Sequence, residues 1–520
     1  MLKLHRQIKQ TKLQPDNDSV TGKKKTNVIG ILSICIFTFS LGIGWYIPGG
    51  LANPFMATFT NVTENNVNLS LTIYMIGVIS AGVFIPLVCF KLNRKYILLW
   101  SAIIFFIGNI IIGVSVNFGM LLFFRFLTGL CHGAMFAVGA VVASALVPKN
   151  KQGSAVALCF TTLFIATFTL VPLFTFTSSI GFPSHINNIL TDHQFLKTYR
   201  SLPMYHQYWR WVFIVTGLIS LVSAILIGFF ISKNIPLKGG QKNPWKQLSI
   251  LLYYPFDLAM IFGMLVFLSI FLIYPLLQKE WRAPDVGIIH DAPEFLALLL
   301  ACYGLTTTYG NQWGGYFSNG KTFPNIYYLM FGLIAVLVCL TISVGAKSPG
   351  AIFAFTIILP IFAYTVLPNT FALGMSLGRY HDKTDAVDLE SGVSEFMVAG
   401  GGMVGSAIGG PICAYHKATI DHPIGSYDPE KFLVVCIIAL VLSGVSIIFL
   451  LPVHWYMHNN QLINKKYKFY SKIINQLPFL YDQYASADVI SEANEIRKNN
   501  SHRKVIEIKP LFHRKVAKSV

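Results

Sequence analysis

Apolar residues run along this chain in blocks of about 20, the length that crosses the roughly 30 Å hydrocarbon core of a bilayer as a helix. Short polar segments separate the blocks. The pattern therefore predicts an all-α membrane protein with twelve transmembrane helices. The predicted spans are residues 28–50, 69–90, 96–117, 119–147, 152–176, 209–232, 252–277, 294–317, 324–346, 349–377, 391–415 and 432–455.

A polar segment divides the spans into two groups of six. Residues 233–251, KNIPLKGGQKNPWKQLSIL, contain four Lys and no acidic residue. This composition predicts a cytoplasmic linker between an N-terminal half (28–232) and a C-terminal half (252–455). The stretches 153–172 and 392–411 each begin with Gly and end with Pro at the predicted fifth span of their half. Such a match is typical of an internal repeat, so we predict two six-helix repeats.

Charge supports this topology. Only 12% of the residues are charged, about half the share in a soluble domain, and the formal net charge is +18. Most of the 40 Lys and Arg residues lie in the basic tails, 1–27 and 456–520, or in alternate short loops. Because cytoplasmic segments are enriched in Lys and Arg, we predict a multi-pass protein of the cell membrane with both termini in the cytoplasm. The same distribution argues against nucleic-acid binding.

Sequence motifs for other chemistry are missing. The eight Cys contain no CxxC pair, which argues against a disulfide framework and a metal site. The sequence has no phosphate-binding Walker loop, GxSxG elbow or HExxH pair, so it predicts neither an enzyme nor a bound cofactor. We expect a monomer in the lipid bilayer. The long outer loop 177–208 and the C-terminal tail have no assigned role.

Two polar side chains interrupt the fourth span, in RFLTGLCHGAMF. Arg125 and His132 are seven residues apart, or two helical turns, and lie on nearly the same face. A cation in the bilayer centre is costly, so Arg125 either lines the protein interior, where it holds an anionic group or tunes a proton carrier, or extends to the outer surface. His132 is either a proton carrier or a neutral histidine that hydrogen-bonds to a neighbouring backbone.

Other polar and aromatic residues are further candidates for a solute and proton pathway. Glu395, near the start of the eleventh span, is either a proton-exchanging acid or an interfacial acid close to the cytoplasm. Trp45, Tyr46, Asn311 and Tyr364 could line a pocket by stacking and hydrogen bonding, or pack as an interfacial belt.

Small residues predict close helix contacts. Gly129 and Gly133 are one turn apart in the fourth span and favour a tight neighbour. Gly401, Gly405 and Gly409 form a stripe along the eleventh span, which suits either sliding between two conformations or static packing.

Several stretches resemble the Major Facilitator Superfamily, and within it the arabinose-efflux-permease-like branch of proton-linked sugar and drug exporters. RFLTGLCHGAMF at 125–136 and LVPKNKQGSAVAL at 146–158 match its pattern of Arg, three residues, Gly, two residues and His-Gly before a basic loop. In the second half, YPLL at 274–277 and EFLALLLACYGLTTTYGNQWGG at 294–315 match as well. The resemblance extends over about residues 28–455.

The chain departs from this family in three places. GWYIPGGL in the first span has Trp45 where the branch usually has an acid. The loop motif between spans two and three is reduced to FKLNRK, whose Lys91, Arg94 and Lys95 the resemblance implies as a cytoplasmic gate. The Gly-rich antiporter pattern of the fifth span is reduced to Pro172.

The resemblance implies a secondary active transporter that works by alternating access. We expect it to export a small organic solute, sugar-like or drug-like, in exchange for protons. The missing acid of the first span keeps an uncoupled facilitator open as an alternative. The polar tail keeps open a membrane sensor or scaffold that does not transport.

Overall fold

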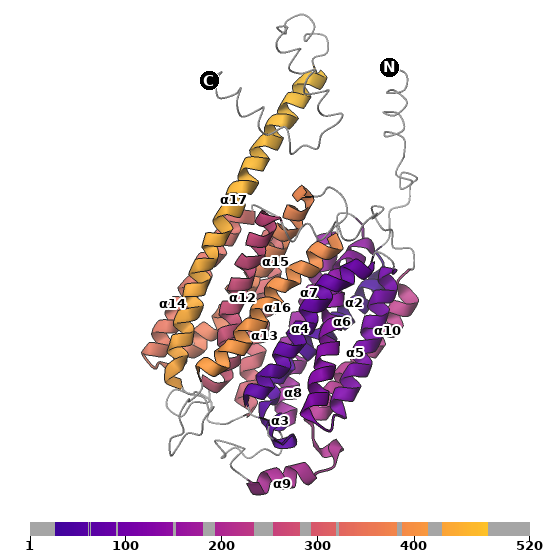
Figure 1. Cartoon of the computed structure of the whole chain (residues 1–520), viewed down its shortest axis with the longest axis vertical. Coiled ribbons are helices and arrows are strands. Elements are labelled where there is room, and N and C mark those ends of the chain that lie inside the picture. Colours follow the sequence, from indigo (N-terminus) through magenta and orange to yellow (C-terminus); the bar gives the residue numbers. More distant parts are fainter. Residues whose placement is uncertain are drawn as a thin grey trace, which may run out of the picture. The chain divides into compact units, whose positions relative to one another are not determined.

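The computed structural model describes residues 26–60, 62, 64–89, 92–148, 152–179, 193–232, 253–280, 293–318, 322–381, 387–413 and 429–476. Every element in these ranges is a helix (Figure 1), which confirms the predicted all-α class. The predicted linker 233–251, the N-terminal tail up to residue 25 and most of the C-terminal tail lie outside the described residues.

The helices follow the predicted order. The N-terminal half contains α2 (Val28–Tyr46), η2 (Ile47–Leu51), α3 (Ala52–Thr58), α4 (Glu64–Cys89), α5 (Arg94–Gly113), α6 (Phe118–Ala145), α7 (Gln152–Phe168), α8 (Leu170–Ser179), α9 (His193–Ser201), η4 (Met204–His206) and α10 (Trp209–Phe230). The C-terminal half contains α12 (Tyr254–Glu280), α13 (Pro293–Ser318), α14 (Thr322–Gly345), α15 (Pro349–His381), α16 (Val387–Ile412), η6 (Pro429–Lys431) and α17 (Phe432–Gln476).

Asparagine side chains start three of the long helices. The side-chain oxygen of Asn27 accepts a hydrogen bond from Gly30 N at 2.9 Å at the start of α2. Asn93 and Asn117 do the same at the starts of α5 and α6. Because the first backbone N–H groups of a helix have no partner within it, such caps fix where each apolar segment becomes helical.

A proline divides the predicted fifth span. Pro172 has no backbone N–H, so the carbonyl of Phe168 loses its ordinary helical partner. The helix accordingly ends at Phe168 and resumes at Leu170, which gives α7 and α8 in place of one straight helix.

Ten helices among the described residues are long and apolar enough to cross a membrane. The predicted eighth and eleventh spans fall short. Helix α13 carries Thr and Asn in its second half, and only Met397–Ile412 of α16 qualifies as a shorter apolar helix. Helix α17 continues past the predicted end of the twelfth span at residue 455. Residues from His454 onward form a separate unit, in which the rings of His454 and His458 lie 6.5 Å apart.

The two halves meet along two pairs of helices. Helix α4 packs against α16, and α7 packs against α13 (Figure 1). The hydroxyls of Thr72 and Ser406 lie 3.4 Å apart in the first pair, and Gln312 donates a hydrogen bond to Thr161 in the second. A Cβ at Gly304 would lie 2.5 Å from the backbone of Phe168, so α13 and α7 are in backbone contact.

Hydrogen bonds join α3, which follows the first span, to the residues just before and at the start of α10. We call this set of contacts the outer clamp, after the predicted outer loop that contributes to it. It consists of α3 and two side chains, Arg200 and Trp209. Arg200 Nε donates to the Ala57 carbonyl at 3.0 Å, and Trp209 Nε1 donates to Thr58 Oγ1 at 2.9 Å. Phe55 packs edge-on against the indole of Trp209, with ring centroids 5.0 Å apart. The described part of the predicted outer loop is therefore fixed to the first span through α3.

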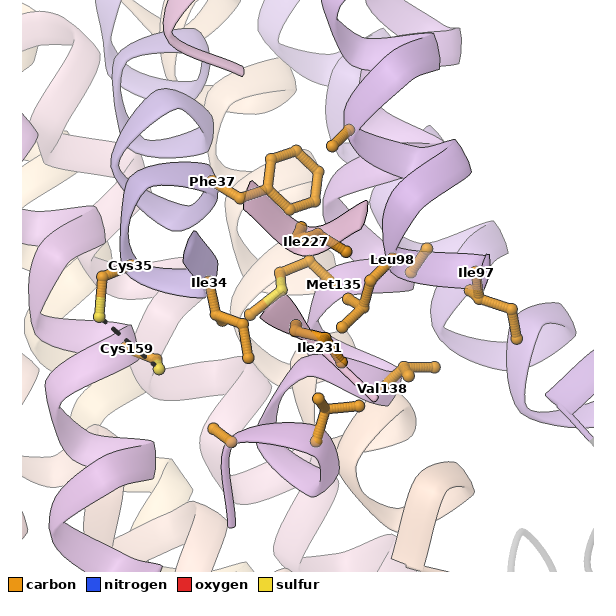
Figure 2. Packing of buried hydrophobic residues seen from close by; sticks show 14 of the residues in the cluster. Ile34, Cys35, Phe37, Ile97, Leu98, Met135, Val138, Cys159, Ile227 and Ile231 are labelled. Carbon is orange, nitrogen blue, oxygen red and sulfur yellow. Dashed lines mark hydrogen bonds between the residues drawn. The ribbon is translucent and has the colours of Figure 1, made fainter. Parts of the chain in front are cut away.

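The core of the N-terminal half packs α2, α5, α6, α7 and α10 around apolar side chains (Figure 2). Ile34, Phe37 and Met135 lie in this cluster and are fully buried. At its edge the thiols of Cys35 and Cys159 approach to 3.9 Å, with the Thr38 and Thr162 hydroxyls 2.6 Å apart one turn further along the same two helices. These contacts fix how α2 faces α7.

Oxidation should join Cys35 to Cys159. We expect copper phenanthroline to oxidise the two thiols to a disulfide, because a small side-chain adjustment brings the sulfurs from 3.9 Å to bonding distance. The measurement is protection of both thiols from maleimide labelling after denaturation, located by peptide mass spectrometry. In a Cys159→Ser variant Cys35 should stay reactive. Full labelling of Cys35 in the oxidised parent protein would contradict the observed packing of α2 against α7.

Candidate functional site

Arg125 is fully buried in α6, with 1% of its surface exposed. Its Nη1 donates to the Gly44 carbonyl in α2 at 2.6 Å, and its guanidinium carbon lies 4.3 Å from the centre of the Tyr74 ring in α4. The Nε and Nη2 groups have no acceptor among the described residues. The structure therefore places the Arg125 side chain inside the protein.

Tyr74 links Arg125 to His132. While its ring lies against the guanidinium, its hydroxyl is 2.6 Å from His132 Nδ1. His132 is fully buried, and its Nε2 has no partner among the described residues. This geometry differs from the alternative of a histidine that hydrogen-bonds to a neighbouring backbone, because the hydrogen bond of His132 among the described residues joins it to a phenol hydroxyl. Arg125, Tyr74 and His132 form what we call the polar centre.

Glycines make the polar centre possible. A Cβ at Gly129 would lie 2.2 Å from the Tyr74 carbonyl oxygen, and one at Gly133 would lie 2.2 Å from that of Val78. Only residues without a side chain let α6 approach the backbone of α4 this closely. The close approach holds Tyr74 between Arg125 and His132.

Trp45 borders the polar centre on the side of the C-terminal half. Its indole meets the His132 ring edge-on at 5.0 Å, stacks on Tyr46 at 5.3 Å, and lies parallel to Phe271 of α12 at 6.3 Å. The indole Nε1 is buried and has no acceptor among the described residues. Where an acid was expected in the first span, the chain therefore supplies an aromatic surface and one N–H donor.

Four tyrosines from both halves come together next to Trp45. The Tyr46 hydroxyl of α2 is 3.1 Å from the Tyr364 hydroxyl of α15, and the Tyr46 ring meets the Tyr274 ring edge-on at 6.1 Å. The Tyr274 and Tyr303 rings are 5.0 Å apart, and the buried Tyr303 hydroxyl has no partner among the described residues. We call Tyr46, Tyr274, Tyr303 and Tyr364 the tyrosine group.

Glu395 is buried in α16, with 1% of its surface exposed, and neither carboxylate oxygen has a partner among the described residues. Gly402 faces Met75 and Ser406 faces Thr72, so α16 runs antiparallel to α4. Glu395 precedes Gly402 by seven residues, or about 10 Å along the helix axis. Because the two helices are antiparallel, Glu395 lies about 10 Å beyond Met75 along α4, toward the residues that contact Gly133. Glu395 is therefore surrounded by protein, at a position that the sequence offered either for a proton-exchanging acid or for an interfacial acid.

The remaining predicted residues lie further from the polar centre. Asn311 is buried in α13, beside Gln312, which bonds to Thr161 of the other half. Arg94 and Lys95 of the predicted gate are buried at the start of α5, where Lys95 Nζ donates to the Gly228 carbonyl of α10 at 2.7 Å. Lys91 lies outside the described residues.

The glycine stripe of α16 faces its own half. Cβ atoms at Gly401, Gly405 and Gly409 would each meet the backbone of α12 between Met264 and Leu272. These contacts fit the static packing alternative within the C-terminal half, whereas Gly402, beside the stripe, faces Phe271 and Met75.

Sequence reasoning missed Tyr74, Phe271 and Tyr274. Each is an aromatic residue inside an apolar span, where such residues are common, so the sequence contains no signal that separates them from ordinary packing. The Gly44 carbonyl was also missed, because a backbone acceptor has no sequence signature at all.

Comparison with known proteins places the chain in a family. The model of the Major Facilitator Superfamily matches residues 34–387. An MFS-type transporter of Bacillus subtilis (strain 168), YtbD, is 26% identical over 400 residues, which cover 76% of this chain and 90% of YtbD. The inner membrane transport protein YdhP of Escherichia coli (strain K12) is 25% identical over 418 residues, covering 80% of this chain and 95% of YdhP.

A solved structure shows the same fold. The outward conformation of FucP, described as a Major Facilitator Superfamily transporter, superposes with a TM-score of 0.56 at 15% identity and covers 81% of this chain and 99% of its own. The family match spans more than half of the chain and agrees with the helical architecture. The protein therefore belongs to the Major Facilitator Superfamily of membrane transporters.

Proposed function

We propose that the protein exports a small organic solute in exchange for protons, by alternating access of the two halves. The observation that supports it best is the buried polar centre beside Glu395, at the contact between α4, α6 and α16. Ionisable groups in a membrane interior are costly to bury, so they are expected where ions or polar solutes pass. The export direction follows from the resemblance of RFLTGLCHGAMF to an exporter branch.

In this proposal each predicted site residue has a stated role in moving the proton or the solute. Arg125 and His132 form the polar path, and Glu395 takes up and releases the proton, because an ionised carboxylate without partners is costly in this interior. Trp45, Tyr46, Asn311 and Tyr364 contact the solute. Lys91, Arg94 and Lys95 hold the cytoplasmic gate closed, while Gly401, Gly405, Gly409 and Pro172 shape the helices.

The topology is part of the same proposal. Both termini and the linker 233–251 lie in the cytoplasm, on the evidence of the Lys-rich segments. Under this topology the outer clamp faces the exterior, and the protein works as a monomer in the cell membrane.

An uncoupled facilitator is the second candidate, and Trp45 favours it. The first span offers an indole where a carboxylate would serve proton exchange, so Glu395 is left as the one buried acid in the described part of the helical bundle. A facilitator would move solute through the same site without protons.

Proton flux in liposomes tests these functions. The purified protein is reconstituted with a pH-sensitive dye trapped inside, and neutral sugars, aromatic acids and amphipathic cations are supplied one at a time. We expect solute-dependent proton movement that is lost in His132→Ala and kept in His206→Ala, a matched change at an exposed histidine. Movement of labelled solute without protons would indicate the facilitator. Solute binding without any flux would indicate the sensor.

A further inference from the structure

The charge of Arg125 has no counter-charge in its surroundings. Its protein contacts are the Gly44 carbonyl and the face of the Tyr74 ring, and no carboxylate among the described residues forms an ion pair with it. The buried carboxylate of Glu395 makes no hydrogen bond with the guanidinium. A buried cation is stable when it is paired, so an anionic partner is the missing component.

Three buried hydrogen-bond donors at Arg125 and Trp45 have no acceptor among the described residues. Two belong to the guanidinium of Arg125, Nε and Nη2, and a third is the indole Nε1 of Trp45. Trp45 follows Gly44, whose carbonyl accepts from Arg125, and the Trp45 indole also meets the ring of His132 in the polar centre, so the donors come from neighbouring parts of the structure. Nε and Nη2 of an arginine form a fork that matches the two oxygens of a carboxylate.

Aromatic surface adjoins these donors. Trp45 stacks on Tyr46 and lies parallel to Phe271, and Tyr46 continues the surface into the tyrosine group. A solute held at one end by Arg125 would place its other end against these rings. Flat, apolar rings pack best on such a surface.

We propose that the transported solute is an organic anion with a carboxylate and an aromatic ring, held by Arg125 and Trp45. This proposal rests on the proposed transport function and adds the chemical class of the solute. Arg125 binds the carboxylate through Nε and Nη2, Trp45 donates its indole N–H to the same group, and the rings of Trp45, Tyr46 and Phe271 receive the ring of the solute.

A matched pair of probes tests the charge. 2-Naphthoate and 2-naphthamide have the same ring and nearly the same shape, but the first is an anion and the second is neutral. We expect calorimetry on the purified full-length protein to show at least tenfold tighter binding of 2-naphthoate. In Arg125→Gln the two affinities should differ less than threefold, while Lys197→Gln, which removes an exposed cation of α9, should keep the preference.

The outcomes separate this inference from the proposed function. Equal affinities, tighter binding of the amide, or no binding of either probe to the parent protein would overturn it, and this comparison stands even if Arg125→Gln fails to fold. Tight binding of 2-naphthoate without proton-linked flux would overturn proton antiport and leave the solute class intact. Proton-linked flux of neutral solutes alone would do the reverse.

Discussion

Gly129→Val should abolish transport and strongly destabilise the protein. The Cβ would lie 2.2 Å from the carbonyl oxygen of Tyr74, and a valine adds two methyl groups beyond it. Since the obstacle is backbone, α6 must move away from α4 to relieve the collision. Overpacking of this kind costs about 1–3 kcal/mol and sometimes more. It also separates Tyr74 from Arg125 and His132, so the polar centre is lost together with the packing.

Thermal unfolding followed by size-exclusion chromatography measures the effect, together with solute flux in liposomes. Gly444→Val is the matched control, because Gly444 also lies in a long helix and a Cβ there would meet nothing within 4 Å. We expect the control to unfold within a few degrees of the parent. A Gly129→Val protein that unfolds at the same temperature as Gly444→Val would show that α4 and α6 are further apart than described.

Glu395→Gln should leave the protein folded and remove its proton-linked flux. Glutamine has nearly the shape of a protonated glutamic acid, so the buried site accepts it without a new charge, but its amide does not ionise and cannot carry a proton through the site. Parent flux should rise as the exterior is made more acidic than the interior, because the gradient then drives protons through Glu395. In the variant, solute flux should not respond to the gradient.

The control for this prediction is Glu430→Gln, an acid-to-amide change at an exposed residue of η6. It should keep the response to the gradient. Glu395→Lys serves as the opposite extreme, since it buries a cation among apolar helices and should prevent folding. Undiminished proton movement in Glu395→Gln would exclude Glu395 as the carrier and make His132 the next candidate.

Hydropathy predicted most of the membrane helices, because the bilayer thickness sets the length of a span and each apolar block of that length is visible in the sequence. Where polar chemistry enters a span, the signal weakens. Helix α13 contains Thr306, Thr307, Thr308 and Asn311, which lower its hydropathy below that of a typical span. The three threonine hydroxyls donate to carbonyls of α13 itself, so the helix accommodates them without a partner from another helix. The break at Thr169 was foreseeable from Pro172, whereas the extension of α17 to Gln476 was not, because polar residues there do not prevent a helix.

The candidate site was predictable within a helix and not between helices. A spacing of seven residues puts Arg125 and His132 on one face, and α6 shows this arrangement. Tyr74, which joins them, comes from another helix, and no local pattern reports which residue of α4 faces α6. The same limit applies to the glycine stripe of α16. The spacing of Gly401, Gly405 and Gly409 predicts a close neighbouring helix, but it does not identify that helix as α12.

The outer clamp sets an order for synthesis of the protein. Arg200 and Trp209 bond to residues 57 and 58, which leave the ribosome some 140 to 150 residues earlier, at a rate of about 5–20 residues per second. The first span and α3 therefore lack these bonds for roughly 7–30 s, until the sixth span begins to insert. Every partner in this closure is present once residue 209 has been made, before translation of the linker 233–251 begins.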